Sequence, residues 1–132
     1  MNRKLVLSAS LLSLVWNFYL TAGVAMNVTA LAPRIAGGQL HSFSGALRFT
    51  YGVQAVVVVF QFIFLYQLFK RRGVWSNSSY LLARIFLILS ALSGVVNLVS
   101  RSPIERWNAI PAFALVYAYV VLGELNFRPR RK

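Results

Sequence analysis

The chain has 132 residues, of which 58% are hydrophobic and 12% are charged, and its formal net charge is +12. Soluble proteins carry about 25% charged residues, and a nucleic-acid-binding protein gathers its basic residues on a soluble face, so the composition excludes both classes. The absence of cysteine excludes disulfides, thiol redox chemistry and cysteine-ligated metals. The basic residues lie in short clusters between long apolar runs, which indicates a membrane protein whose first partner is the lipid bilayer.

Four apolar stretches are close to the length that a transmembrane helix needs, about 20 residues. They cover residues 5–26, 51–69, 80–100 and 109–125. Because backbone polar groups in lipid must be paired within their own segment, each stretch is expected to be a helix. The sequence therefore predicts an all-α fold: one domain, residues 1–132, in which four transmembrane helices form an antiparallel bundle.

The first stretch has a second interpretation, as a signal peptide. Arg3 and Lys4 precede an apolar run, and Gly23 and Ala25 are small residues before a possible cleavage point. However, the run exceeds the usual apolar core of a signal peptide, about 7–15 residues, and it contains Trp16. A retained helix is therefore favoured over a cleaved one.

The connections between the predicted helices differ in length. Residues 27–50 form the only long connection, either as a linker on the headgroups or as a contact site outside the membrane. The short basic turn at 70–79 predicts a tight hairpin between the second and third helices.

The basic clusters predict the orientation in the membrane. Arg3 and Lys4 precede the first helix, residues 70–72 follow the second, and residues 128–132 form the tail. In a four-span chain these segments share one side and hold nine positive charges, whereas the opposite side holds four. The positive-inside rule then places both termini in the cytoplasm, and the membrane is expected to be a bacterial inner membrane.

Each predicted helix carries polar residues, which cost free energy in lipid unless they are paired. Turning these residues inward gives the bundle a polar interior, formed by Asn17, Gln54, Gln61, Asn97 and Tyr117. Such side chains either join helices by hydrogen bonds or line a polar crevice. The sequence leaves both interpretations open.

Two charged residues are expected inside the membrane near its cytoplasmic face. Arg84 lies four residues into the third helix, and Glu124 lies four residues before Arg128. Because intramembrane charges usually pair, we expect an Arg84–Glu124 ion pair. In the alternative, Arg84 reaches the lipid phosphates and Glu124 contacts the basic tail.

The segment between the third and fourth helices has the pattern of a helix start. Ser102 is expected to be the N-cap, Pro103 the first helical residue and Glu105 the capping-box partner. Trp107 then lies in the interfacial aromatic belt. These residues either cap the helix or contact a partner or a headgroup.

Groups that could carry catalysis are scarce. One histidine, His41, and two carboxylates cannot supply a usual zinc or two-metal site, so no enzyme activity, metal or cofactor is expected. The favoured interpretation is a small accessory or scaffold subunit that binds another membrane protein or itself. The alternative is a small homo-oligomeric transporter or channel with a path through the polar interior. An intramembrane enzyme or a lipid-binding protein is disfavoured by the shortage of titratable groups.

Overall fold

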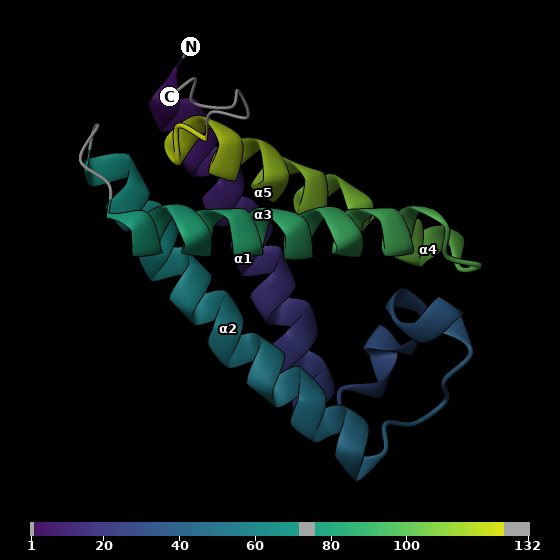
Figure 1. Cartoon of the computed structure of the whole chain (residues 1–132). Helices are drawn as coiled ribbons and strands as arrows, with labels where there is room; N and C mark the ends of the chain where they lie inside the picture. Colours follow the sequence, from purple (N-terminus) through teal and green to yellow (C-terminus); the bar gives the residue numbers. More distant parts are fainter. Residues whose placement is uncertain (1, 72–75, 126–132) are drawn as a thin grey trace.

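The computed structural model describes residues 2–71 and 76–125, in which every regular element is helical (Figure 1). The elements are α1 (Arg3–Ala25), the 3₁₀ helices η1 (Thr29–Arg34) and η2 (Ala36–Gly38), α2 (Gly45–Lys70), α3 (Asn77–Leu98), α4 (Pro103–Arg106) and α5 (Ala109–Leu122). The helices α1, α2 and α3 are each long and apolar enough to cross a membrane. The chain is thus all-helical with three candidate spans, and α5 is shorter, with 14 residues.

Polar side chains fix where most of the helices begin. In α1, α2, α3 and α4 the residue before the helix accepts a hydrogen bond from a backbone N–H of the first turn; these caps are Asn2, Ser44, Ser76 and Ser102. Each cap satisfies a donor that would otherwise lack a partner. The cap at Ser44 also explains why α2 begins at Gly45, before the apolar stretch that starts at residue 51.

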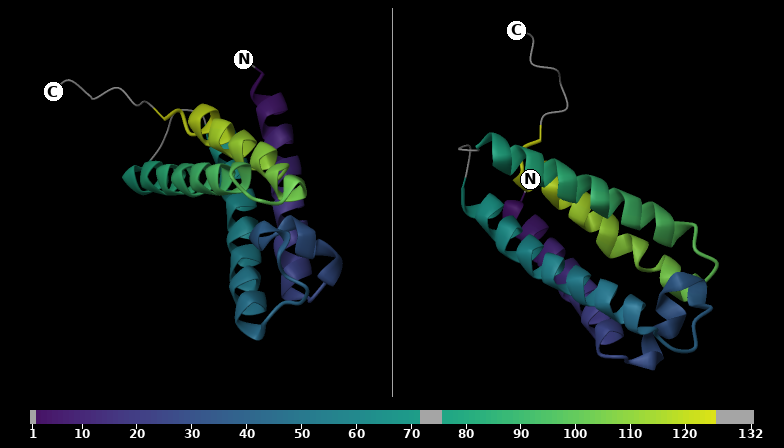
Figure 2. Two further views of the ribbon diagram at one scale, coloured as in Figure 1. Left: turned by 90° about the vertical axis from the view of Figure 1, so that its right-hand side faces the viewer. Right: turned by 60° about the horizontal axis from the view of Figure 1, so that its bottom comes forward.

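The long helices form two antiparallel hairpins. α1 packs along α2, α3 packs along α5, and α1 also packs against α5. Figures 1 and 2 show the hairpins converging at one end, which holds Arg3 and the region around Lys70 and is called here the terminal end. They diverge toward the opposite end, the loop end, where residues 26–44 and α4 lie.

The expected tight hairpin between α2 and α3 is wrong. These helices make only marginal contact and splay apart from the terminal end (Figure 1). The reason is the position of the small residues of α3: Ala83, Ser90 and Gly94 are buried, and Gly94 lies against the ring of Phe113 on α5. Since small residues permit the closest approach of helices, α3 packs on α5 and diverges from α2.

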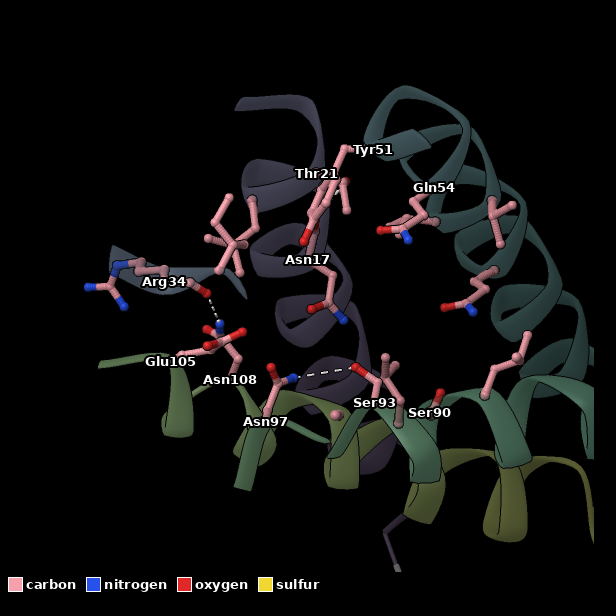
Figure 3. Close-up of a pocket in the computed structure, with 18 residues that line it drawn as sticks. Asn17, Thr21, Arg34, Tyr51, Gln54, Ser90, Ser93, Asn97, Glu105 and Asn108 are labelled. Carbon is pink, nitrogen blue, oxygen red and sulfur yellow. Dashed lines mark hydrogen bonds between the residues drawn. The ribbon is translucent and has the colours of Figure 1, made fainter. Parts of the chain in front are cut away.

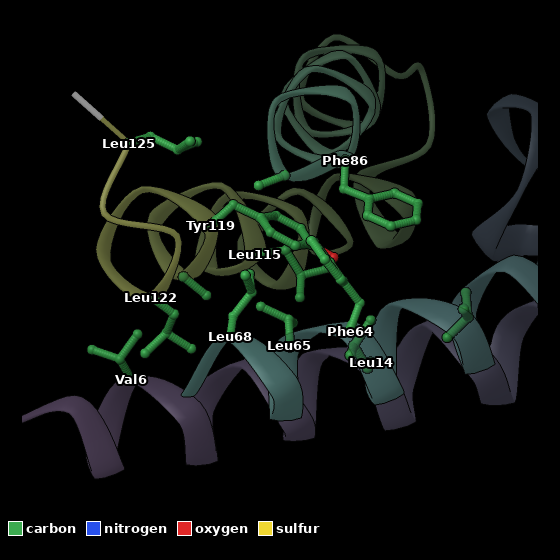
Figure 4. Packing of buried hydrophobic residues seen from close by; sticks show 13 residues of the cluster. Val6, Leu14, Phe64, Leu65, Leu68, Phe86, Leu115, Tyr119, Leu122 and Leu125 are labelled. Atoms are coloured by element: carbon green, nitrogen blue, oxygen red, sulfur yellow. The ribbon is translucent and has the colours of Figure 1, made fainter. Parts of the chain in front are cut away.

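The main hydrophobic core lies where the hairpins converge (Figure 4). Its fully buried side chains come from α1, α2 and α5 and include Leu14, Leu65, Leu68, Tyr119 and Leu122. The Phe64 ring of α2 has its centroid 5.8 Å from that of Phe86 on α3 and 6.5 Å from that of Tyr119. Large aromatic surfaces dominate core energetics, so these three rings join α2, α3 and α5 to one another.

The segment between α1 and α2 is folded against the loop end. Ala32, Ile35 and Phe43 form a second buried cluster with Val24 of α1. The side chain of Arg48, in the first turn of α2, donates from Nε to the carbonyl oxygen of Ala25, 3.1 Å away. The connection is therefore a packed cap over the ends of α1 and α2.

Tyr119 tests the packing of the main core, because its hydroxyl is buried without a hydrogen-bond partner among the described residues. We expect Tyr119→Phe to keep the free energy of unfolding unchanged or to raise it by up to about 1 kcal/mol, since the ring contacts stay and an unsatisfied polar group is removed. Tyr119→Ala is expected to lower it by about 3–5 kcal/mol. Reversible unfolding in detergent micelles measures both, and a clear loss of stability in Tyr119→Phe would contradict the unpaired hydroxyl.

Candidate functional site: a polar cavity between the hairpins

A cavity of about 430 Å³ lies between the two hairpins, on the loop-end side of the aromatic core (Figure 3). This volume is within the range of small-molecule sites, about 300–1,000 Å³. Polar side chains from both hairpins line it: Asn17, Thr21, Arg34, Tyr51, Gln54, Gln61, Ser90, Ser93, Asn97, Glu105 and Asn108. Apolar residues such as Leu20, Val58 and Leu115 form the rest of the lining.

Four of the five residues expected in a polar interior line this cavity, namely Asn17, Gln54, Gln61 and Asn97. The fifth, Tyr117, lies outside it on α5 and is 51% exposed. Residues two apart on a helix point about 200° apart, and α5 turns the neighbouring Tyr119 into the core. The structure therefore assigns the interior position to Tyr119 in place of Tyr117.

The amide side chains of the cavity are only partly used within the protein. Asn97 donates from Nδ2 to Ser93 Oγ at 3.4 Å. No side-chain hydrogen bond is made by Asn17, Gln54 or Gln61 to any residue that the structure describes. These three amides present both donors and acceptors, so the cavity can bind a polar group.

At the loop end, the segment around η1 and η2 is fastened to the start of α4. Ser102 Oγ donates to the carbonyl oxygen of Pro33 at 2.6 Å and accepts from the backbone N–H of Glu105 at 3.3 Å. Glu105 Oε2 accepts from the backbone N–H of Gly37 at 2.8 Å and from Ser100 Oγ. These five residues are called the latch.

Ser102 is the N-cap of α4, with Pro103 in its first turn. The reciprocal half of a capping box is not formed, because the backbone N–H of Ser102 donates to Ser100 Oγ at 3.1 Å. Glu105 is 7% exposed, and its carboxylate accepts a hydrogen bond from the facing segment. Trp107 is 69% exposed and outside the latch.

Glycine is required where the facing segment meets the latch. Gly37 and Gly38 have φ angles of +71° and +72°, a region that side chains disfavour. A Cβ atom on Gly38 would lie 3.2 Å from Ser102 Cβ. The Gly–Gly pair thus allows the backbone N–H of Gly37 to reach Glu105.

A second set of polar contacts beside the latch was not expected from the sequence. Trp16 donates from Nε1 to Asn108 Oδ1 at 3.1 Å, and Asn108 donates from Nδ2 to the carbonyl oxygen of Arg34 at 3.0 Å. The guanidinium of Arg34 lies over the Trp16 ring, 5.1 Å from its centroid. The only local signal was the position of Asn108 directly after the helix-start pattern.

At the terminal end, Glu124 pairs with Arg3 rather than with Arg84. Arg3 Nη1 lies 2.9 Å from Glu124 Oε1, and Arg3 Nη2 donates to the carbonyl oxygen of Leu68 at 3.4 Å. Arg84 is exposed on α3, because its neighbour Ala83 occupies the face toward α5. The expected Arg84–Glu124 pair is thus replaced by a contact that joins α1, α2 and the end of α5; the basic tail at 128–132 lies outside the described residues.

The cavity lining offers amides, hydroxyls, one carboxylate and one guanidinium. Within residues 2–71 and 76–125 no group of three His, Cys, Asp or Glu residues could hold a metal ion, and His41 is exposed and does not line the cavity. No protein family, curated protein or solved structure matches this chain. The function is therefore inferred from the geometry of the cavity and its surroundings.

Double-mutant cycles can distinguish the Arg3–Glu124 pair from the expected Arg84–Glu124 pair. For Arg3→Gln and Glu124→Gln we expect a coupling energy of about 0.5–1 kcal/mol, the size of a partly exposed ion pair. Arg84→Gln with Glu124→Gln is expected to show none. Unfolding free energies in detergent provide both values, and coupling of Glu124 to Arg84 alone would contradict the observed pairing.

Proposed function

We propose that the chain is a bacterial inner-membrane protein with four spans and both termini in the cytoplasm. In this topology α4 and α5 make the fourth crossing together, since α5 alone would rise about 21 Å across a hydrocarbon core of about 30 Å. The terminal end then carries Arg3, Lys4, Lys70 and Arg71, as the positive-inside rule requires. α1 is a retained span in this proposal, because Leu14 and Val24 are fully buried.

We further propose that the protein is a non-enzymatic accessory or scaffold subunit, which binds another membrane protein or a second copy of itself between α2 and α3. The observation that carries this proposal is the uncovered polar lining between these helices at membrane depth. Gln54 of α2 and Ser93 of α3 are exposed, and Asn17 and Gln54 have no side-chain partner in the described part of the chain. Uncovered polar groups are unfavourable in lipid, and hydrogen bonds from a partner helix would satisfy them.

A transporter or channel is the second candidate, because the cavity gathers Asn17, Gln54, Gln61 and Asn97. Its terminal-end side, however, is filled by the rings of Phe64, Phe86 and Tyr119. A conducting path would require these rings to separate. Because the cavity is closed on its terminal-end side, we favour a binding function over conduction.

The proposed topology can be tested by single-cysteine labelling, since the natural chain has no cysteine. A membrane-impermeant maleimide added to intact cells is expected to label Gln39→Cys at the loop end. Ser76→Cys at the terminal end is expected to react only after the membranes are opened. Both positions are exposed in the structure, so the reverse pattern would contradict cytoplasmic termini.

The proposed docking face can be tested by photo-cross-linking in cells. A photoreactive amino acid at Ser93, which lines the cavity, is expected to give one discrete adduct with another membrane protein or with a second copy. Val95 is the matched control, because it is exposed on the same helix at nearly the same depth but points about 200° away. Gln54→Leu is expected to weaken the adduct at Ser93.

Equal adducts at Ser93 and Val95, or no adduct at Ser93, would contradict docking between α2 and α3. The transporter candidate makes a different prediction. Gln61→Cys would then be labelled by water-soluble reagents from both sides of the membrane, whereas the binding proposal expects labelling only from the loop-end side.

A further inference from the structure

Glu105 is buried, and the described part of the chain supplies no counter-charge to its carboxylate. Its exposed fraction is 7%, and it forms no ion pair with any residue in the described ranges. Oε2 accepts hydrogen bonds from Gly37 and Ser100, whereas no described residue donates to Oε1, which is not fully enclosed by the protein. Burying a charged group costs free energy unless the group is paired and hydrogen-bonded. Oε1 of Glu105 is therefore a strong acceptor that a ligand can use.

Two basic residues of the loop end, Arg34 and Arg106, are engaged elsewhere. Arg34 lines the cavity, but its guanidinium lies over the Trp16 ring and points away from the cavity in Figure 3. Arg106 donates from Nε to the carbonyl oxygen of Ser100 at 2.8 Å. The chain itself therefore supplies no cation to Glu105 in the described structure.

Glu105 lines the same cavity as several neutral acceptors. The side-chain amides of Asn17 and Gln54 and the hydroxyl-bearing side chain of Tyr51 lie around it (Figure 3). A carboxylate oxygen and several amide oxygens that line one cavity match a group that carries positive charge and several hydrogen-bond donors. A primary ammonium has three donors and no acceptor, and charge-assisted hydrogen bonds are about twice as strong as neutral ones.

We propose that the cavity is a binding site for a primary ammonium group, with Glu105 Oε1 as its charged acceptor. The ligand is either a water-soluble amine or the headgroup of an aminolipid, which could enter where α2 and α3 diverge. A quaternary ammonium carries the same charge but no N–H donor, so the site is expected to discriminate against it. This inference does not depend on a protein partner.

The first test uses the unaltered full-length protein in detergent micelles and measures its thermal unfolding midpoint. Added phosphatidylethanolamine is expected to raise the midpoint by mass action, whereas phosphatidylcholine is expected to raise it much less. Ethanolamine without acyl chains distinguishes the two sources of the group: an equal rise indicates a soluble amine, and a rise with the lipid alone indicates an aminolipid. Equal effects of the primary and quaternary lipids would overturn the proposal.

The second test uses the two acidic residues of the chain as a matched pair. Glu105→Gln can keep an oxygen toward Gly37 and Ser100 while placing an NH₂ group where Oε1 lies, so the latch is retained. Its Kd for the amine is expected to be at least about 10-fold weaker, the loss of one charge-assisted hydrogen bond. Glu124→Gln, which alters the distant Arg3 contact, is expected to bind like the natural protein.

Unchanged amine binding by Glu105→Gln would overturn the assignment of Glu105. If that variant fails to fold, the comparison of primary and quaternary lipids on the unaltered protein still decides. Loss of binding in Glu105→Gln with intact cross-linking at Ser93 would separate this site from the proposed docking function.

Discussion

The carboxylate of Glu105, with the neighbouring Ser102 and Asn108 side chains, joins the two helical hairpins at the loop end, where α2 and α3 are furthest apart (Figure 1). Its hydrogen bond from Gly37 joins the segment attached to α1 and α2 to the start of α4. At the opposite end, the joint is made by aromatic rings and by the Arg3–Glu124 pair. Because contacts connect the hairpins at both ends, the angle between α2 and α3 is fixed. The cavity lies in the space that this angle leaves between them.

The polar groups of the latch and those of the cavity differ in how far they are satisfied. Ser102 of the latch and Asn108, at the edge of the cavity beside it, are buried and use their side chains as donor and acceptor, as buried polar groups generally do. The cavity retains unpaired amides and one unpaired carboxylate oxygen within the described residues. Within the described residues, the Tyr119 hydroxyl and Arg3 Nε are also unpaired, but three unpaired side-chain amides lie together only in the cavity.

Local patterns were enough to predict the helical stretches and the cap at Ser102, because apolar length and capping chemistry act within one segment. Contacts between segments were harder, since they depend on how each helix is rotated. A rotation of two residues separates Tyr117 from Tyr119, and only the packing of α5 decides between them. The splay of α2 and α3 depends on which helix receives the small face of α3, and no feature of the 70–79 turn records that choice.

The packing of the helices also determines the partners of the two carboxylates, Glu105 and Glu124. The sequence spacing predicted that Glu124 would pair with Arg84. In the structure the end of α5 lies against the start of α1, where Arg3 pairs with Glu124. Glu124 remains 41% exposed in its side chain, so water shares the cost of its charge and a surface ion pair suffices. Glu105 is nearly excluded from solvent, and two hydrogen bonds to neutral groups offset only part of the desolvation of a carboxylate. That imbalance makes a cationic ligand, rather than a neutral one, the group that this cavity is best suited to bind.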